Sequence, residues 1–371
     1  MKHIPTLALA LAFSAIPVFS HASSHPVGNV YTQSNQVAGN SILIYNRFSD
    51  GHLEAAGSVS TGGLGTGAGL GNQNGVTLSQ DGRFLYAVNA GSNSVSIFEV
   101  SAFGRLSLRD VQPSCGVRPI SVTQSGNLVY VLNDGQGEAS ASIQGFFQSR
   151  RGELTAIPGA SSGLSQAHPG SAQIQFTPKG DGLVVTEKAT NTIDTFDLDR
   201  WGRPSQVSFQ ASVGQTPFGF DFDRRGRLFV SEAFGGATDA SALSSYRLSR
   251  NLDLTPISPS APTTETAACW TVVSNNGRYA YTTNAGSGSV SGYRIASDGS
   301  LSLIDAGGVS GSTGAGSAPI DIVITNNDRF VYVLAGGSHS IVGFRVESSG
   351  NLTAIDTDGG LPVGTNGLAV R

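Results

Sequence analysis

Two carboxylates and one histidine are the side chains of this sequence best suited to moving protons. Glu187 and Glu232 end apolar runs at matching places in successive segments of the chain. Two carboxylates in unlike surroundings can divide into an acid and a base, and a close pair can ligate a hard cation. His168 is the remaining candidate for a general base. The alternative is that all three are solvated surface groups, with Lys188 neutralising Glu187.

A second set of residues has the composition of a small-molecule site. Its members stand at the start of short apolar segments that recur along the chain. They are Asn74, Arg118, Gln173, Phe218, Trp270, Asp321 and Asn366. Concave ligand sites combine aromatic surfaces with a few polar groups that orient the ligand. The alternative is that the polar members only solvate a water-filled channel.

These residues are positioned by a repeat of roughly fifty residues. Its signature is a polar turn followed by a run of strand-forming residues, as in 81–86 and 276–281. Copies end at positions 86, 130, 185, 230, 281 and 332, so the spacings are 44, 55, 45, 51 and 51 residues. A polar turn and an alternating segment such as 95–100 follow, and this period of two indicates strands. Several short strands in each unit of this length are typical of a propeller blade.

The two ends of the chain supply parts of one repeat. Residues 362–370 resemble the segment that opens the other units, for example 74–78, whereas the unit around Tyr31 has no such segment before it. We therefore expect an all-β, seven-bladed β-propeller whose first blade is completed by the C-terminal strand. Closure of this kind removes exposed sheet edges. It also gathers the leading ends of the innermost strands, and with them the ligand-binding set, at one mouth of a central channel.

The N-terminus has the pattern of an export signal. A short polar start, an apolar run over 4–19 and a small-x-small motif at 20–22 predict a signal peptide over 1–22. The remaining residues, 23–371, are expected to form one propeller domain. The apolar run is short and contains Pro5 and Pro17, which argues against a permanent membrane anchor. The sequence thus predicts a periplasmic or secreted protein.

Composition excludes several function classes. Acidic residues outnumber basic ones by 26 to 22, and no basic stripe is present for tracking phosphates. No zinc-binding spacing, catalytic triad, nucleophile elbow or phosphate loop occurs, since the glycine-rich run 61–69 is followed by neither a helix nor a lysine. We expect no metal, no cofactor, and no nucleic-acid or membrane partner. The expected form is a monomer with a small-molecule ligand at the channel mouth.

The two cysteines, Cys115 and Cys269, fall in repeats three blades apart. In a seven-fold ring this separation places them on nearly opposite sides, whereas a disulfide needs Cα atoms within about 7 Å. We therefore expect two unpaired thiols, both of them buried, because cysteine side chains are usually buried. One disulfide is the alternative, because an oxidising compartment permits it.

The blade phrases at 81–89 and 286–291 resemble the seven-bladed lactonase propeller family, which includes propeller-type 6-phosphogluconolactonases and fungal carboxymuconate lactonising enzymes. The resemblance spans nearly the whole chain after the signal. It implies a catalytic Arg and His before a Phe-x-Pro-x-Gly turn, and a Glu after the next strand. The turn is present at 176–180 and Glu187 lies near the Glu position, but the Arg and His positions hold Ala172 and Gln173.

Two functional hypotheses follow. In the first, the protein hydrolyses a lactone or related cyclic ester at the channel mouth. Arg118 would polarise the carbonyl, and Glu187, Glu232 or His168 would activate water. Phe218 and Trp270 would stack on the substrate ring. In the second, the same mouth or its outer loops bind a ligand or a protein without catalysis.

Overall fold

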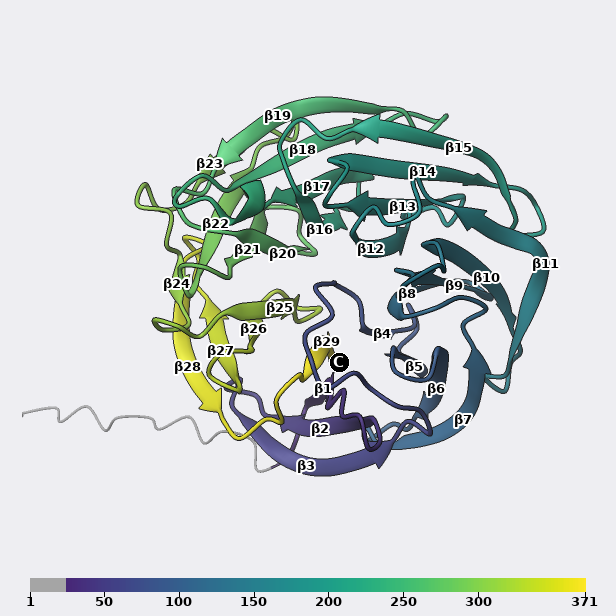
Figure 1. Ribbon diagram of the computed structural model, residues 1–371. Helices are drawn as coiled ribbons and strands as arrows, with labels where there is room; N and C mark the ends of the chain where they lie inside the picture. The colour runs from purple at the N-terminus through teal and green to yellow at the C-terminus, as the bar shows by residue number, and fades with distance from the viewer. Residues whose placement is uncertain (1–24) are drawn as a thin grey trace, which may run out of the picture.

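The computed structural model describes residues 25–371, so the signal peptide predicted over 1–22 lies outside the described part of the chain. Seven antiparallel sheets stand around one central axis, each forming one blade (Figure 1). The only helical element in this range is a single 3-10 turn, η1 (Phe234–Gly236). The predicted all-β, seven-bladed propeller is confirmed. Among residues 25–371, no helix has the length and apolar character needed to cross a bilayer.

The blades are numbered along the chain, and the strands of each are given from the channel outward. Blade 1 contains β29 (Asn366–Val370), β1 (Gly28–Gln33), β2 (Ser41–Arg47) and β3 (Leu53–Ser60). Blade 2 contains β4 (Val76–Leu78), β5 (Phe84–Asn89), β6 (Ser94–Val100) and β7 (Leu106–Pro113). Blade 3 contains β8 (Pro119–Ser125), β9 (Leu128–Asn133), β10 (Ser142–Gln148) and β11 (Leu154–Gly163). Blade 4 contains β12 (Ser171–Phe176), β13 (Gly182–Glu187), β14 (Thr192–Leu198) and β15 (Pro204–Ala211).

The remaining three blades repeat this arrangement. Blade 5 contains β16 (Pro217–Phe222), β17 (Arg227–Glu232), β18 (Ala242–Leu248) and β19 (Leu254–Pro262). Blade 6 contains β20 (Ala268–Val273), β21 (Tyr279–Asn284), β22 (Ser289–Ile295) and β23 (Leu301–Leu303), and the short β24 (Gly311–Ser312) also pairs with β22. Blade 7 contains β25 (Pro319–Ile324), β26 (Phe330–Ala335), β27 (Ser340–Val346) and β28 (Leu352–Asp358).

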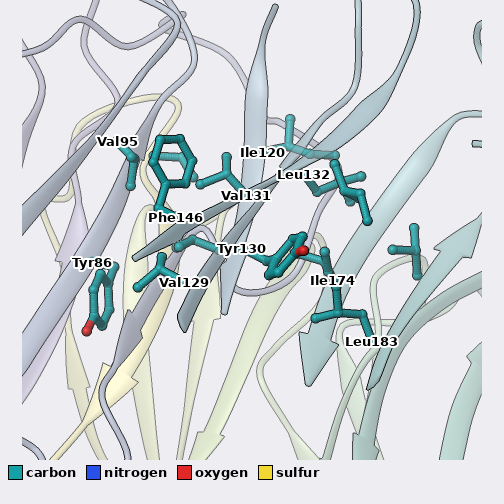
Figure 2. Close-up of a cluster of buried hydrophobic side chains, with 14 of the residues drawn as sticks. Tyr86, Val95, Ile120, Val129, Tyr130, Val131, Leu132, Phe146, Ile174 and Leu183 are labelled. Atoms are coloured by element: carbon teal, nitrogen blue, oxygen red, sulfur yellow. The ribbon is translucent and has the colours of Figure 1, made fainter. Parts of the chain in front are cut away.

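The core lies between the faces of neighbouring blades. The second strand of each blade is packed on both faces, so β5 and β13 are buried along their whole length. Outer strands such as β7 expose most of their residues. One apolar cluster runs through blades 2, 3 and 4, and Figure 2 shows its side chains filling the spaces between these sheets. Burial on both sides explains why the second strands have apolar and small residues in unbroken runs.

The C-terminal strand closes the ring. β29 pairs antiparallel with β1, with Val30 opposite Val370 and Tyr31 opposite Ala369. On its other side, the Asp321 Oδ2 atom of β25 accepts a hydrogen bond of 2.9 Å from the Leu368 N–H. The last strand of the chain therefore joins blade 7 to blade 1, as predicted.

The tyrosine that ends the repeat signature links one blade to the next. In four blades its hydroxyl donates to the carbonyl of a glycine in the outer turn of the following blade. These pairs are Tyr31–Gly104 (2.9 Å), Tyr130–Gly202 (2.6 Å), Tyr281–Gly350 (2.8 Å) and Tyr332–Gly51 (2.7 Å). Blades 4 and 5 have valine at this position. The repeated tyrosine is thus an inter-blade clamp, and its hydroxyl satisfies a carbonyl that would otherwise be buried.

Both cysteines are unpaired. Cys115 is exposed and Cys269 is buried, and they form no disulfide. The prediction of two free thiols is confirmed, although only one of them is buried.

We predict that Tyr281→Phe lowers the free energy of unfolding by about 1–3 kcal/mol, because the Gly350 carbonyl loses its donor. Tyr45→Phe is the matched control, since the Tyr45 hydroxyl forms no hydrogen bond within residues 25–371. Urea unfolding followed by tyrosine and tryptophan fluorescence measures both. Equal midpoints for the two variants would contradict the clamp.

Candidate functional site

The innermost strands all begin at one end of the channel, which we call the leading mouth, and end at the other, the trailing mouth. The connection between β3 and β4 enters the middle of the ring (Figure 1). Its last part, Gly71–Asn74, crosses the leading mouth and is called the channel segment below. It bonds to β8 through Ile120, to β12 through Ala172, and to β20 through Thr271. The chain therefore covers the mouth at which a ligand was expected.

Gln73 is the central residue of the channel segment. Its side-chain amide donates to the Thr271 carbonyl at 2.8 Å and accepts from the Thr271 N–H at 3.1 Å. Its backbone N–H donates to the Ala172 carbonyl at 3.1 Å. A side chain at Gly219 would have its Cβ 2.1 Å from Gln73 Oε1 and 2.6 Å from the Cys269 carbonyl oxygen. Glycine at 219 is therefore required for Gln73 to lie against blade 6.

Three members of the predicted ligand-binding set hold this segment in place. The Trp270 indole N–H donates to the Asn72 carbonyl at 2.6 Å, and the Asn366 amide donates to Asn72 Oδ1 at 2.9 Å. The Phe218 ring packs on Trp270 with ring centroids 4.8 Å apart. All three side chains are buried. The structure thus brings these residues together, but around the protein's own backbone.

Two further members of the set join neighbouring blades. Gln173 donates to the Phe220 carbonyl at 2.9 Å and accepts from the Phe220 N–H at 2.7 Å. Asp321 accepts from Leu368 of blade 1 and from the Ile322 N–H at 2.8 Å. Burial raises the pKa of Asp321 to about 8. Both side chains satisfy backbone groups on the channel-facing edge of a sheet.

The predicted electrophile and histidine base lie at the rim of the leading mouth. Arg118 forms an ion pair of 2.5 Å with Asp134, and both side chains are partly exposed. His168 is exposed, and its Nε2 atom lies 3.0 Å from the Gly137 carbonyl oxygen. Neither contacts Glu187 or Glu232 through a hydrogen bond in the described residues. Their catalytic roles stay predictions.

Glu187 is completely buried inside blade 4. It accepts hydrogen bonds from the Ser165 N–H at 2.9 Å, from the Ser165 hydroxyl, and from Thr190 Oγ1 at 2.5 Å. Asp194 on β14 is also fully buried, and burial together with the neighbouring Glu187 raises its pKa to about 10. Burial and the neighbouring carboxylate thus both favour the protonated form of Asp194.

Glu232 is buried in the same way within blade 5. It accepts from the Gly214 N–H at 3.0 Å, and from the hydroxyls of Ser244 and Ser260 at 2.5 and 2.6 Å. Burial raises its pKa, although these three donors oppose the shift. Asn89 and Asn284 occupy the same place in blades 2 and 6 and bond to serines of the next strand. At this position the two glutamates tie strands together, and the role of activating water stays a prediction for them.

Lys188 fastens the channel segment to blade 4. Its Nζ atom donates to the Gly71 carbonyl at 2.5 Å and to the Ser171 carbonyl at 2.8 Å, and it lies 4.7 Å from the centre of the Phe218 ring. Burial lowers the pKa of this amine to about 8, against the opposing attraction of Asp134. Lys188 does not bond to Glu187 and so does not neutralise it as the alternative interpretation supposed.

The trailing mouth, in contrast, is hollow. Two adjoining cavities of about 460 and 420 Å³ open there between the ends of the innermost strands. Asn74, Thr77, Gln80 and Asp221 line both. Asp221 Oδ1 accepts from Gln175 Nε2 at 3.2 Å, and Oδ2 accepts from the Val273 N–H at 2.8 Å. Burial raises the pKa of Asp221 to about 6, and these hydrogen bonds limit the shift.

Sequence reasoning missed Asp221 because it compared the leading ends of the inner strands. The available signal was the alternation of residues 218–222, which turns the carboxylate of Asp221 toward the channel near the far end of the strand. Of the predicted set, only Asn74 lines the trailing cavities. No cluster of three or more His, Cys, Asp or Glu residues in the described range is arranged to hold a metal ion.

The match to a family is extensive. The model of the family described as "Lactonase, 7-bladed beta-propeller" matches residues 34–143, 136–233 and 240–365. This chain belongs to that family of seven-bladed lactonase propellers. No curated protein matches it in sequence.

Solved structures of similar fold come from several organisms. A putative 6-phosphogluconolactonase from Bacteroides fragilis is 19% identical, covers 94% of this chain and 99% of its own, and has a TM-score of 0.71. The periplasmic gluconolactonase of Pseudomonas aeruginosa is 16% identical, with 92% and 98% covered and a TM-score of 0.69. A hypothetical selenium-binding protein from Sulfolobus tokodaii is 12% identical, with 93% and 94% covered and a TM-score of 0.66. At these identities the likeness concerns the fold.

We predict that Gly219→Ala displaces the channel segment and lowers the free energy of unfolding by about 1–3 kcal/mol, because the new methyl group overlaps Gln73 and the Cys269 carbonyl. Gly163→Ala is the control, since a Cβ there meets no atom within 4 Å and the backbone is not left-handed. Urea unfolding measures both changes. A Gly219→Ala variant as stable as Gly163→Ala would argue against tight packing of the segment.

We also predict a pH dependence from Lys188. Because its pKa falls from 10.5 to about 8 on folding, the unfolded chain binds this proton more tightly than the folded chain between these values. The free energy of unfolding of the wild type, relative to Lys188→Met, should therefore rise as the pH increases from about 8 to 10.5. Below pH 8 the difference should be constant. A difference that falls across this interval would contradict the buried amine.

Proposed function

We propose that this member of the lactonase propeller family is an exported hydrolase of small polar lactones, with its reaction site in the trailing half of the channel. The observation that carries the proposal is the open polar cavity around Asp221, in a channel whose leading mouth is covered by Gly71–Asn74. Membership of the lactonase family supports a cyclic ester as substrate. The export signal predicted over 1–22 supports a location outside the cytoplasm.

Asp221 is the general base of this proposal. Its pKa of about 6 leaves it ionised at neutral pH yet basic enough to accept a proton. It would take a proton from water as the water oxygen attacks the lactone carbonyl carbon. The ring C–O bond then breaks, and the leaving alkoxide takes this proton from Asp221, which gives the hydroxy acid and restores the carboxylate.

Asn74 is the polarising group. Its Nδ2 atom lies 3.5 Å from both the Ile174 carbonyl and Gln175 Oε1, the outer limit of a hydrogen bond. Its amide N–H groups are therefore weakly held and can turn toward a ligand oxygen. A donor directed at a developing oxyanion contributes about 3–4 kcal/mol to catalysis.

The charge of the cavity favours an uncharged substrate. The polar part of its lining is mainly amides and hydroxyls, with the carboxylates of Asp81, Asp221 and Asp223. The arginines at its edge are Arg224 and Arg371, and Arg371 donates to the Ser101 carbonyl outside the cavity. A phosphorylated ring would meet carboxylates without a dedicated cation. We therefore expect a neutral, hydroxylated lactone.

A binding protein without catalysis is the second candidate. It is favoured because this chain has Ala172 and Gln173 at the positions where the family has Arg and His. The Ala172 carbonyl accepts a hydrogen bond from the channel segment, and the Gln173 side chain bonds to blade 5. In that case the same cavity would hold a neutral sugar-like ligand.

We predict that Asp221→Asn lowers kcat/KM on a hydrolysed lactone by about 10²–10⁴-fold, since the base is lost. Wild-type activity should decline as the pH falls below about 6, the pKa of Asp221. Asp298→Asn, an exposed turn carboxylate of blade 6, is the matched control. A panel of neutral and phosphorylated lactones, assayed by acid release, provides the measurement.

Arg118→Ala separates the two mouths. Loss of activity in Arg118→Ala with retention in Asp221→Asn would move the reaction to the leading mouth and refute the site proposed here. If no lactone is turned over but calorimetry detects a ligand that Asp221→Asn fails to bind, the second candidate is supported.

A further inference from the structure

The basic residues of this protein lie almost entirely on one of its two faces, whereas acidic residues lie on both. Of the basic residues in 25–371, only Arg118 and Lys188 belong to the leading side of the ring. The others lie at turns of the trailing side or within half a strand of them. This division is hidden in the overall composition, in which acidic residues predominate.

The exposed aromatic side chains are also confined to one part of the ring. Phe103 is 86% exposed, Trp201 54%, Phe209 50% and Phe147 49%, and they belong to blades 2, 3 and 4. Other large apolar residues that are exposed in the described chain are valines and leucines. Exposed aromatic residues are costly to leave in water, so the two that lie at turn tips, Phe103 and Trp201, indicate an interaction surface.

Phe103 and Trp201 occupy the same place in equivalent turns. The turn between β6 and β7 and the turn between β14 and β15 each contain an aromatic residue followed by glycine and arginine. The glycine, Gly104 or Gly202, receives the tyrosine clamp of the preceding blade. The clamp fixes the turn and leaves the aromatic ring projecting from its tip.

Arginines also lie at the trailing turns of blades 2, 3 and 4. The guanidinium of Arg200 lies 3.8 Å from the centre of the Trp201 ring. Arg105, Arg150 and Arg151 are exposed at the turns of blades 2 and 3. None of these four forms an ion pair with another described residue. Asp199 accepts from the Trp201 and Arg203 N–H groups and pairs with Arg203, so its charge is used within the turn.

We propose that these turns form a docking edge for an anionic lipid surface. The edge is defined as Phe103, Arg105, Arg150, Arg151, Arg200 and Trp201. Tryptophan and phenylalanine rings insert at the level of lipid headgroups, and nearby arginines are attracted by anionic lipids. The rings project from turn tips of blades 2 and 4, with the arginines of blade 3 between them in the ring, which suits a plane better than a groove-binding peptide. This proposal departs from the expectation, based on composition, that no membrane is a partner, and it does not depend on the proposed hydrolysis.

Vesicle sedimentation tests the docking edge. The probes are vesicles of phosphatidylcholine mixed with phosphatidylglycerol and vesicles of phosphatidylcholine alone, with the purified chain from residue 23. The protein should sediment with the anionic vesicles and much less with the neutral ones, and added salt should release it. The partition coefficient should fall about fivefold for each arginine removed in Arg150→Ser and Arg151→Ser. It should fall about tenfold in Trp201→Ser.

Two controls match these variants. Phe209→Ser removes an exposed aromatic ring from an outer strand of blade 4, and Arg329→Ser removes an exposed arginine from blade 7. Both should sediment like the wild type. If Trp201→Ser alters the unfolding midpoint, the arginine variants, which change only exposed side chains, still decide the test.

Three results would overturn the proposal. One is equal sedimentation with anionic and neutral vesicles, or none with either. Another is a loss in Phe209→Ser or Arg329→Ser as large as that in the edge variants. The third is a wild-type dimer without vesicles that Trp201→Ser dissociates, because a second copy would then be the occupant of the edge.

Discussion

The channel-facing edge of each blade poses the constraint on which the rest of this structure depends. An innermost strand pairs with its own blade on one side only, so its other edge presents backbone N–H and C=O groups that no further strand satisfies. In this protein, side chains of the neighbouring inner strand take that place. Gln173 bonds both groups of Phe220, Asp221 accepts from Val273, and Asp321 accepts from Leu368. Seven separate sheets are thereby joined at the centre as well as through their apolar faces.

The channel segment extends the same solution across the axis. Gln73 bonds both backbone groups of Thr271, just as Gln173 does those of Phe220. Because the segment lies over the leading mouth, the amides and aromatic rings gathered there bind the protein's own backbone and hold the segment in place. We therefore propose that function belongs to the groups near the trailing mouth, where Asn74 holds its acceptors weakly and the cavities are open. The division between a covered and an open mouth is therefore a consequence of how the ring is held together.

The sequence predicted the architecture well because blades are local. Turn residues and period-two alternation at 81–86 or 276–281 determine a strand whatever the rest of the chain does. The recurrence of these phrases gave the blade count, and residues 362–370 gave the closure. The unpaired cysteines followed from the same geometry. The family resemblance drawn from these phrases is confirmed over most of the chain.

The site was less predictable, since its properties depend on what occupies the channel. Trp270, Asn366 and Phe218 were correctly grouped at one mouth, but nothing in their spacing shows that Asn72 would be their partner. The repeat predicted that Glu187 and Glu232 are equivalent, but it did not predict their burial. That burial depends on Ser165 in the connection before β12 and on Ser244 and Ser260 in β18 and β19. Asp221 was missed because its proposed role depends on the cavity beside it, which only the structure shows.

The most direct test of this account is a crystal structure of Asp221→Asn in complex with an intact lactone. The account predicts density for the ligand in the trailing cavity, within hydrogen-bonding distance of residue 221 and Asn74, with Gly71–Asn74 still crossing the leading mouth. Ligand density beside Arg118 and Lys188, with the channel segment displaced, would contradict it.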